Sequence, residues 1–66
     1  MRETLVKLRG QTKQSDVAAE LSISQQYLSE IERGLKTPSA RTMITISTYY
    51  NRTLQELFPD VFKPIG

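Results

Sequence analysis

A chain of 66 residues with 38% hydrophobic content can fold as one small domain, which we place over residues 1–66, and is too apolar to be disordered. It has no cysteine and no histidine, which excludes disulfides, Cys/His zinc sites, thiol nucleophiles and imidazole bases; we therefore expect no metal, no cofactor and no enzymatic activity. The net charge of +2 permits a local phosphate-contacting surface but argues against bulk electrostatic attraction as the whole of any binding mechanism.

No stretch of the sequence indicates a membrane protein or a secreted one. No apolar run approaches the roughly 18–20 residues of a membrane span. Residues 1–10 mix charged and apolar side chains throughout, unlike a signal peptide. We therefore expect a cytoplasmic protein.

The chain begins with two short predicted helices. The first covers residues 3–9 and ends at Gly10. The second starts near Gln14, and its apolar face recurs at helical spacing, formed by Val17, Ala18 and Leu21.

A turn at residues 22–24 leads into a third predicted helix. Ser24 can cap this helix through its hydroxyl, and Gly34 can end it because glycine enters the left-handed region without steric cost. Leu28 and Ile31 lie on the inward face. A helix, a short turn and a second helix, with polar residues outside, form the pattern of a helix-turn-helix over residues 14–34.

The outward face of the third helix carries side chains suited to DNA. Glutamine can bond to the major-groove edge of adenine, serine can bond to several bases, and arginine can read guanine or hold a phosphate. A solvated polar face is the plainer interpretation of the same residues, and the whole motif favours DNA over it. We expect base contacts from Gln25, Gln26, Tyr27, Ser29 and Glu30.

Two more helices are predicted in the C-terminal half. Ser39 follows Pro38 and caps a helix over residues 40–50. Thr53 and Glu56 have the spacing of a capping box that begins a last helix over residues 54–58. The inward residues of the longer helix are expected to be Met43, Ile46, Ser47 and Tyr50.

Residues 5–58 resemble the lambda-repressor-like (Cro/cI, XRE-type) helix-turn-helix family. The segments that carry the resemblance are LVKLRG (5–10), QSDVAAELSIS (14–24), QQYLSEIERG (25–34), the Pro-Ser pair at 38–39 and ISTYYNRTLQELF (46–58). The resemblance implies a compact all-α fold of five helices, with the third in the major groove of double-stranded DNA. It also implies a bacterial or phage regulator of transcription, associated with the nucleoid, and for most members a two-fold dimer.

Further expectations come from the resemblance. It implies an ion pair between Arg9 and Glu32, and a phosphate contact at Gln14. Lys13 departs from the family, in which Ser or Thr is usual before that glutamine. Ser22 is a second departure, because glycine is usual at this turn position. The turn tends to need a positive φ there, which costs a serine on the order of 1 kcal/mol. The expected phosphate contacts are Lys13, Gln14, Ser24, Arg33, Lys36, Thr37 and Arg41.

Two of these residues have more than one interpretation. For Glu30 we expect pairing with Arg33 at i+3 before base readout, because an acid on this face repels phosphates. Tyr27 can contact a thymine methyl or the DNA backbone, or can fill the edge of the core.

The tail over residues 59–66 is the least determined segment. Phe58, Val61, Phe62 and Ile65 are apolar enough to fold back on the core or to form the seam of a homodimer around the last helix. The two interpretations stay open from the sequence.

The expected function is that of a Cro/cI-type repressor, dimeric on a pseudo-palindromic operator. Because no sensor domain is visible, an inducer would have to be another protein, such as an antagonist. The alternative is a protein-interaction module of the same fold, such as an antitoxin or an adaptor, which the modest charge and Glu30 keep open.

Overall fold

The computed structural model describes residues 1–63, and it contains helices but no strand over that range. The helices are α1 (Glu3–Arg9), α2 (Gln14–Glu20), α3 (Gln25–Arg33), α4 (Ala40–Tyr50) and α5 (Leu54–Leu57). The expected five-helix, all-α fold is confirmed. None of these helices is long and apolar enough to cross a membrane.

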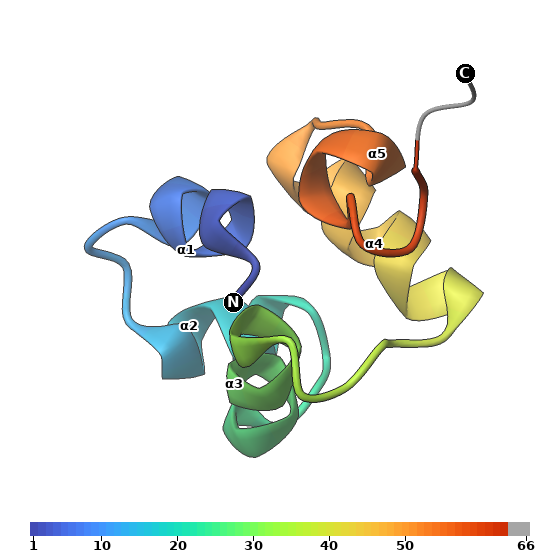
Figure 1. The fold of residues 1–66 in the computed structure, drawn as a ribbon. Coiled ribbons are helices and arrows are strands. Elements are labelled where there is room, and N and C mark those ends of the chain that lie inside the picture. The colour runs from blue at the N-terminus through green and yellow to red at the C-terminus, as the bar shows by residue number, and fades with distance from the viewer. Residues whose placement is uncertain (64–66) are drawn as a thin grey trace.

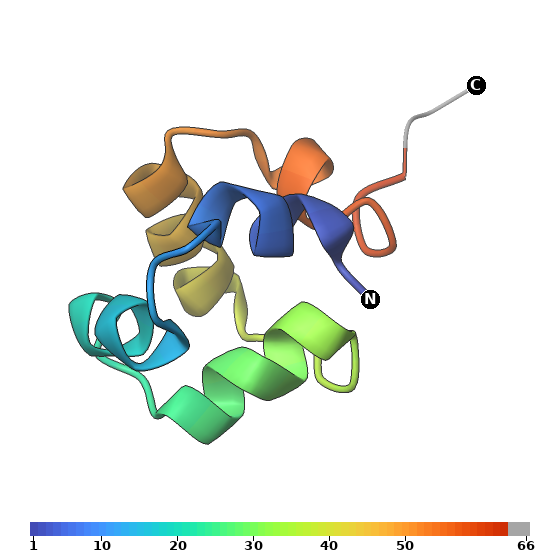
Figure 2. The same cartoon turned by 90° about the vertical axis from the view of Figure 1, so that its left-hand side faces the viewer.

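The helices pack in two groups (Figure 1). α1, α2 and α3 lie on one side, α4 and α5 lie on the other, and α1 bridges the groups because it packs against both α3 and α5. Turned by 90°, α3 (green) runs along one edge of the molecule, with its outer side uncovered by any other helix (Figure 2). α3 is therefore placed to meet a large partner along its length.

Every helix contributes to a single core. The residue after α5, Phe58, is its largest fully buried side chain. The fully or nearly fully buried apolar residues are Leu5, Val17, Ala18, Leu21, Leu28, Ile31, Met43, Ile46, Leu57 and Phe58. Burying each large side chain contributes roughly 1.5–3 kcal/mol, so this core accounts for most of the favourable free energy of a chain this short.

The helix ends form where the capping residues predict them. Ser24 accepts from the Tyr27 N–H at 3.0 Å, and Ser39 accepts from the Thr42 N–H at 3.3 Å. The capping box of Thr53 and Glu56 is present in both directions. α2 lacks a side-chain cap, as Lys13 at its N-cap predicts, and α5 ends one residue earlier than expected because Phe58 leaves the helical conformation.

The turn between α2 and α3 has the geometry expected at Ser22. Its φ is 59°, in the left-handed region that glycine adopts without cost. The turn is closed by the N–H of Ser22, which donates to Ala19 O at 3.1 Å, and by the N–H of Ile23, which donates to Ala18 O at 3.0 Å. The motif therefore forms with serine at this position. Asn51 adopts a similar φ of 55° after α4.

Phe58 and Phe62 pack against the core. Phe58 is wholly buried and Phe62 is half-buried against the core, because the N–H groups of Val61 and Phe62 turn back to Phe58 O at 3.0 and 2.9 Å. The prediction that Phe58 could lie in a dimer seam is therefore wrong, because none of its surface is exposed to a partner. Val61 is 38% exposed, and Ile65 lies outside the described residues.

Candidate DNA-binding site

α3 separates its side chains cleanly into a buried row and an outer row. Leu28 and Ile31 have at most 1% of their surface exposed. Gln25 and Gln26 are exposed in the first turn, while Ser29 is partly exposed one turn further on. The Ser24 hydroxyl already accepts from the Tyr27 N–H, which leaves its own proton free to donate to another group.

Tyr27 is partly buried and packs against the core. Of the interpretations that the sequence leaves open, the structure places the ring at the core edge. A contact from its exposed part to DNA stays a prediction.

A three-residue network behind α3 joins it to α1 and α2. The Glu32 carboxylate, with 4% of its side chain exposed, accepts hydrogen bonds from Arg9 Nε at 2.8 Å and from Arg9 Nη2 at 3.1 Å. Gln14 Nε2 donates to the same carboxylate at 3.0 Å. The hydrogen bond to Glu32 raises the pKa of Arg9 above its ordinary value. The expected Arg9–Glu32 pair is confirmed.

Gln14 has a role in this network that the sequence did not indicate. One of the two N–H groups of its amide is engaged by Glu32, so the second N–H and the carbonyl oxygen stay available at the start of α2. Lys13, immediately before it, is exposed. The phosphate contacts of both residues stay predictions.

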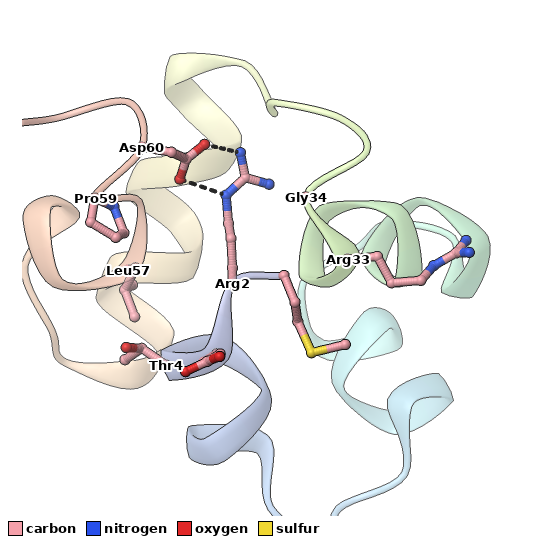
Figure 3. A pocket seen from close by; sticks show the side chains of 9 residues that line it. Arg2, Thr4, Arg33, Gly34, Leu57, Pro59 and Asp60 are labelled. Carbon is pink, nitrogen blue, oxygen red and sulfur yellow. Dashed lines mark hydrogen bonds and ion pairs between the residues drawn. The ribbon is translucent and has the colours of Figure 1, made fainter.

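Glu30 does not pair with Arg33 as expected. Its carboxylate lies 3.5 Å from Lys36 Nζ, while Arg33 Nε donates to Ser29 O at 3.4 Å. Gly34 is the cause, because its left-handed φ of 79° reverses the chain and lets the N–H groups of Leu35 and Lys36 reach Glu30 O at 2.9 and 3.4 Å. Lys36 is thereby held near Glu30, whereas the Arg33 side chain lies along α3 and points away from Arg2 and Asp60 (Figure 3).

The segment after α3 presents further polar groups beside its C-terminal end. Lys36 and Thr37 are exposed, Pro38 is buried, and Arg41 is exposed in the first turn of α4. Exposed cations thus follow α3 at Lys36 and Arg41, and a further exposed cation, Lys13, stands at the start of the neighbouring α2. An exposed polar row with cations near it is suited to a duplex, whose base edges are bordered by phosphates.

Comparison with known proteins decides the family. A family model described as Helix-turn-helix matches residues 4–57, which is most of the chain. The chain belongs to the XRE-type (Cro/cI-like) helix-turn-helix family. No curated protein and no solved structure matches it. XRE-type domains are DNA-binding regulators and are typically not enzymes, which supports DNA as the partner of the α3 face.

The helix-turn-helix also rests on a residue that sequence reasoning missed. Arg2 is 5% exposed, and its side chain bonds to the end of α3, to the following loop and to Asp60. A charged residue next to the start of a chain is normally solvated, so composition gave no reason to single it out. One signal was available: Arg2 lies three residues before Leu5, on the side of α1 that is buried.

Tyr50 is the other unexpected feature of this XRE-type domain. Its hydroxyl oxygen is buried and has no hydrogen-bond partner. Burial, and after it the negative charge of Glu32, raises the pKa of Tyr50 to about 12. Among residues 1–63 no cluster of acidic, cysteine or histidine side chains could hold a metal ion.

Proposed function

We propose that this chain is a sequence-specific transcriptional repressor of the Cro/cI type, which binds a pseudo-palindromic operator as a dimer. The observation that carries the proposal is the outer row of α3, which is polar and uncovered, with exposed cations in the segment after α3 and at the start of the neighbouring α2. Membership of the XRE-type family supports the same conclusion.

α3 would lie in the major groove. Gln25, Gln26 and Ser29 would read base edges, with Tyr27 and Glu30 beside them. Lys13, Gln14, Ser24, Arg33, Lys36, Thr37 and Arg41 would bond to phosphates and fix the register of α3 on the duplex. Two copies would read half-sites about one helical turn, ~34 Å, apart.

The dimer would form around α5 and the tail. Val61 is exposed and Phe62 is half-buried, so an apolar contact between two copies is available there. Repression would be steric, with the bound dimer blocking or touching polymerase in the cytoplasm, at the nucleoid. An antagonist would be another protein.

Selection from a random duplex pool with purified protein tests this function, followed by fluorescence anisotropy of the selected duplex across a salt series. We expect a two-fold-symmetric consensus, nanomolar-range affinity and much weaker binding to a shuffled duplex. The salt slope then counts the phosphate contacts. No enrichment, or equal binding to the shuffled duplex, would overturn the proposal.

A single substitution separates base readout from general attraction. Gln26→Ala should weaken binding to the selected duplex by about 1–3 kcal/mol and leave binding to the shuffled duplex unchanged, with the fold intact by circular dichroism. Gln11→Ala, an exposed glutamine between α1 and α2 to which we assign no contact, is the matched control and should change neither affinity.

The alternative is a protein-interaction module such as an antitoxin or an adaptor. The ion pair of Glu30 and Lys36 favours it, because an acid on the α3 face lowers attraction to phosphates and satisfies a cation that DNA would otherwise use. Under this alternative Gln26→Ala has no effect on DNA binding, and selection yields no consensus.

A further inference from the structure

The Arg2 side chain uses every donor that it has. Nε and Nη2 donate to the two carboxylate oxygens of Asp60 at 3.2 and 2.8 Å, as the dashed lines in Figure 3 show. Nη1 donates to Ile31 O at 2.7 Å and to Lys36 O at 2.8 Å, and Nη2 also donates to Thr37 Oγ1 at 3.4 Å. Since a guanidinium has five N–H groups, none is left for solvent.

The surroundings of Arg2 fix the plane of this guanidinium. Its side chain is 4% exposed, and its central carbon lies 5.3 Å from the centre of the Phe58 ring, which is itself fully buried. The face of an aromatic ring attracts a cation, so Phe58 adds to the bonds that orient Arg2. A cavity of about 420 Å³ opens beside it, between the start of the chain, the end of α3 and the turn after α5 (Figure 3).

The partners of Arg2 belong to the DNA-facing part of the molecule. Ile31 O lies in the last turn of α3, where it also accepts from the Gly34 N–H at 3.1 Å. The Arg2 backbone N–H satisfies Glu32 O at 2.8 Å in the same turn. Lys36 and Thr37 are the two residues of the following loop to which we assign phosphate contacts. Arg2 thus holds the backbone of Lys36 and the hydroxyl of Thr37.

We propose that Arg2 is a positioning residue for DNA binding: it fixes the loop over residues 35–37 against the end of α3, so that Lys36 and Thr37 meet the phosphates, and Asp60 orients its guanidinium. The inference rests on the proposed function, because it assigns Arg2 a part in gripping the duplex. It also links the turn after α5 to the DNA-contacting loop through one side chain.

Lysine at position 2 separates geometry from charge. It keeps the positive charge but offers three donors from a single atom, so it cannot bond to Asp60 as a fork and reach both carbonyls at once. A role through bulk charge is preserved in Arg2→Lys, whereas a role through the five-bond geometry is lost.

The experiment is a double-mutant cycle on the selected duplex, at a temperature where circular dichroism shows each variant fully folded. The single variants are Arg2→Lys, Lys36→Ala and Lys13→Ala, and Arg2→Lys is combined with each of the other two. Lys13 is the matched control, because it is a proposed phosphate contact at the start of α2 and is not among the residues to which the Arg2 side chain bonds.

We expect Arg2→Lys to weaken binding about three- to tenfold and to reduce the salt slope by roughly one contact. Adding Lys36→Ala to it should weaken binding by no more than about twofold further, because that contact is already lost. Adding Lys13→Ala should weaken binding by its full single-variant factor. Asp60→Asn should shift affinity in the same direction by a smaller factor, because Arg2 keeps its bonds to the two carbonyls.

Two results would overturn the inference while leaving the proposed function standing. One is an unchanged affinity and salt slope in Arg2→Lys. The other concerns the two double variants: in both, the loss of affinity equals the product of the two single-variant losses. A general weakening of the fold would act on Lys36→Ala and Lys13→Ala alike and would give this result. If the unsubstituted protein fails to bind any duplex, the proposed function falls by that measurement alone, and this inference falls with it.

Discussion

Ser22 holds a conformation that favours glycine, and this gives a direct test of strain in the turn between α2 and α3. Its φ of 59° is in the left-handed region, where a side chain costs on the order of 1 kcal/mol. Ser22→Gly should therefore raise the free energy of unfolding by up to about 1 kcal/mol, measured by urea titration.

An exposed serine in a helix is the matched control for that change. Ser15 lies in α2, where glycine is unfavourable, so Ser15→Gly should lower the free energy of unfolding by about 0.5–1 kcal/mol. If both substitutions destabilise the protein equally, the turn is not strained at Ser22.

The buried hydroxyl of Tyr50 predicts a substitution that stabilises the protein. Its oxygen has no partner, and an unsatisfied buried polar group costs about 1–3 kcal/mol. Tyr50→Phe should therefore raise the free energy of unfolding at pH 7, by about 1 kcal/mol. A loss of stability would mean that the hydroxyl is satisfied in solution.

Tyr50 also predicts how stability changes in alkali. Its pKa of about 12 in the folded chain exceeds the ordinary value of 10.0, so the folded state holds the proton more tightly. Below pH 10 the hydroxyl is protonated in both states, so this difference does not affect the free energy of unfolding. As the pH rises from 10 toward 12 the unfolded chain loses the proton first, and the free energy of unfolding falls. The stability advantage of Tyr50→Phe should widen over that interval.

At the scale of helices, the sequence allowed the bounds to be predicted almost throughout. Serine and threonine caps and glycine ends act on N–H and C=O groups a few residues away, so the information is local. Ser24, Ser39 and Thr53 each begin the expected helix. The division of α3 into a buried and an outer row follows from its 3.6-residue period alone.

The partner of Glu30 could not be predicted in the same way. Spacing along a helix favours Arg33, but the reversal at Gly34 brings Lys36 to the same face. A contact that depends on how the chain leaves a helix needs the loop geometry, and residue spacing does not contain it.

The ion pair on the α3 face gives a prediction about indiscriminate DNA binding. Glu30→Gln releases Lys36 and removes a charge that repels phosphates. We expect affinity for the shuffled duplex to rise roughly fivefold, equivalent to about 1 kcal/mol, and the salt slope to gain about one contact. Anisotropy titration at several salt concentrations measures both quantities.

Glu3→Gln makes the same change of net charge on α1 and is the control. Glu3 is exposed and has no ion pair among the described residues. Equal gains in the two variants would show that net charge, and not the release of Lys36, governs binding to the shuffled duplex.

At the scale of the whole molecule, the contacts that close the fold were the hardest to predict. Arg2 and Asp60 are 58 residues apart, and nothing in the residues near either one indicates the other. The core position of Phe58 was one of two open alternatives, because an apolar residue after a helix suits a core and an interface equally. Periodicity predicts which face of a helix is buried, but not what buries it.

The Arg2–Asp60 pair predicts part of the acid sensitivity of the fold. The hydrogen bond from Arg2 holds the pKa of Asp60 below its ordinary value of 3.8. Its stabilising contribution is therefore present above that pH and is lost as the pH falls through the lower, folded-state value. Because the Asp60 side chain is 54% exposed, the contribution should be about 1 kcal/mol or less.

The measurement is the difference in unfolding free energy between the unsubstituted protein and Asp60→Asn, from urea titrations between pH 6 and pH 2. The difference should be largest at pH 6 and should shrink below about pH 4. Hydrogen bonds to Thr53 also lower the pKa of the Glu56 carboxyl. Because Glu56 titrates in both proteins, its effect cancels in the difference between them. A constant difference would mean that Asp60 is not ionised in its bond to Arg2.

The fork between Arg2 and Asp60 has a mechanical consequence. When tension separates residue 60 from residue 2, the two parallel bonds of the fork are loaded together, because both join the same two side chains. The three remaining bonds of the guanidinium lie outside that load path and keep the loop attached to α3. Under a pulling force we therefore expect the turn after α5 to separate from residue 2 before the loop over residues 35–37 separates from α3.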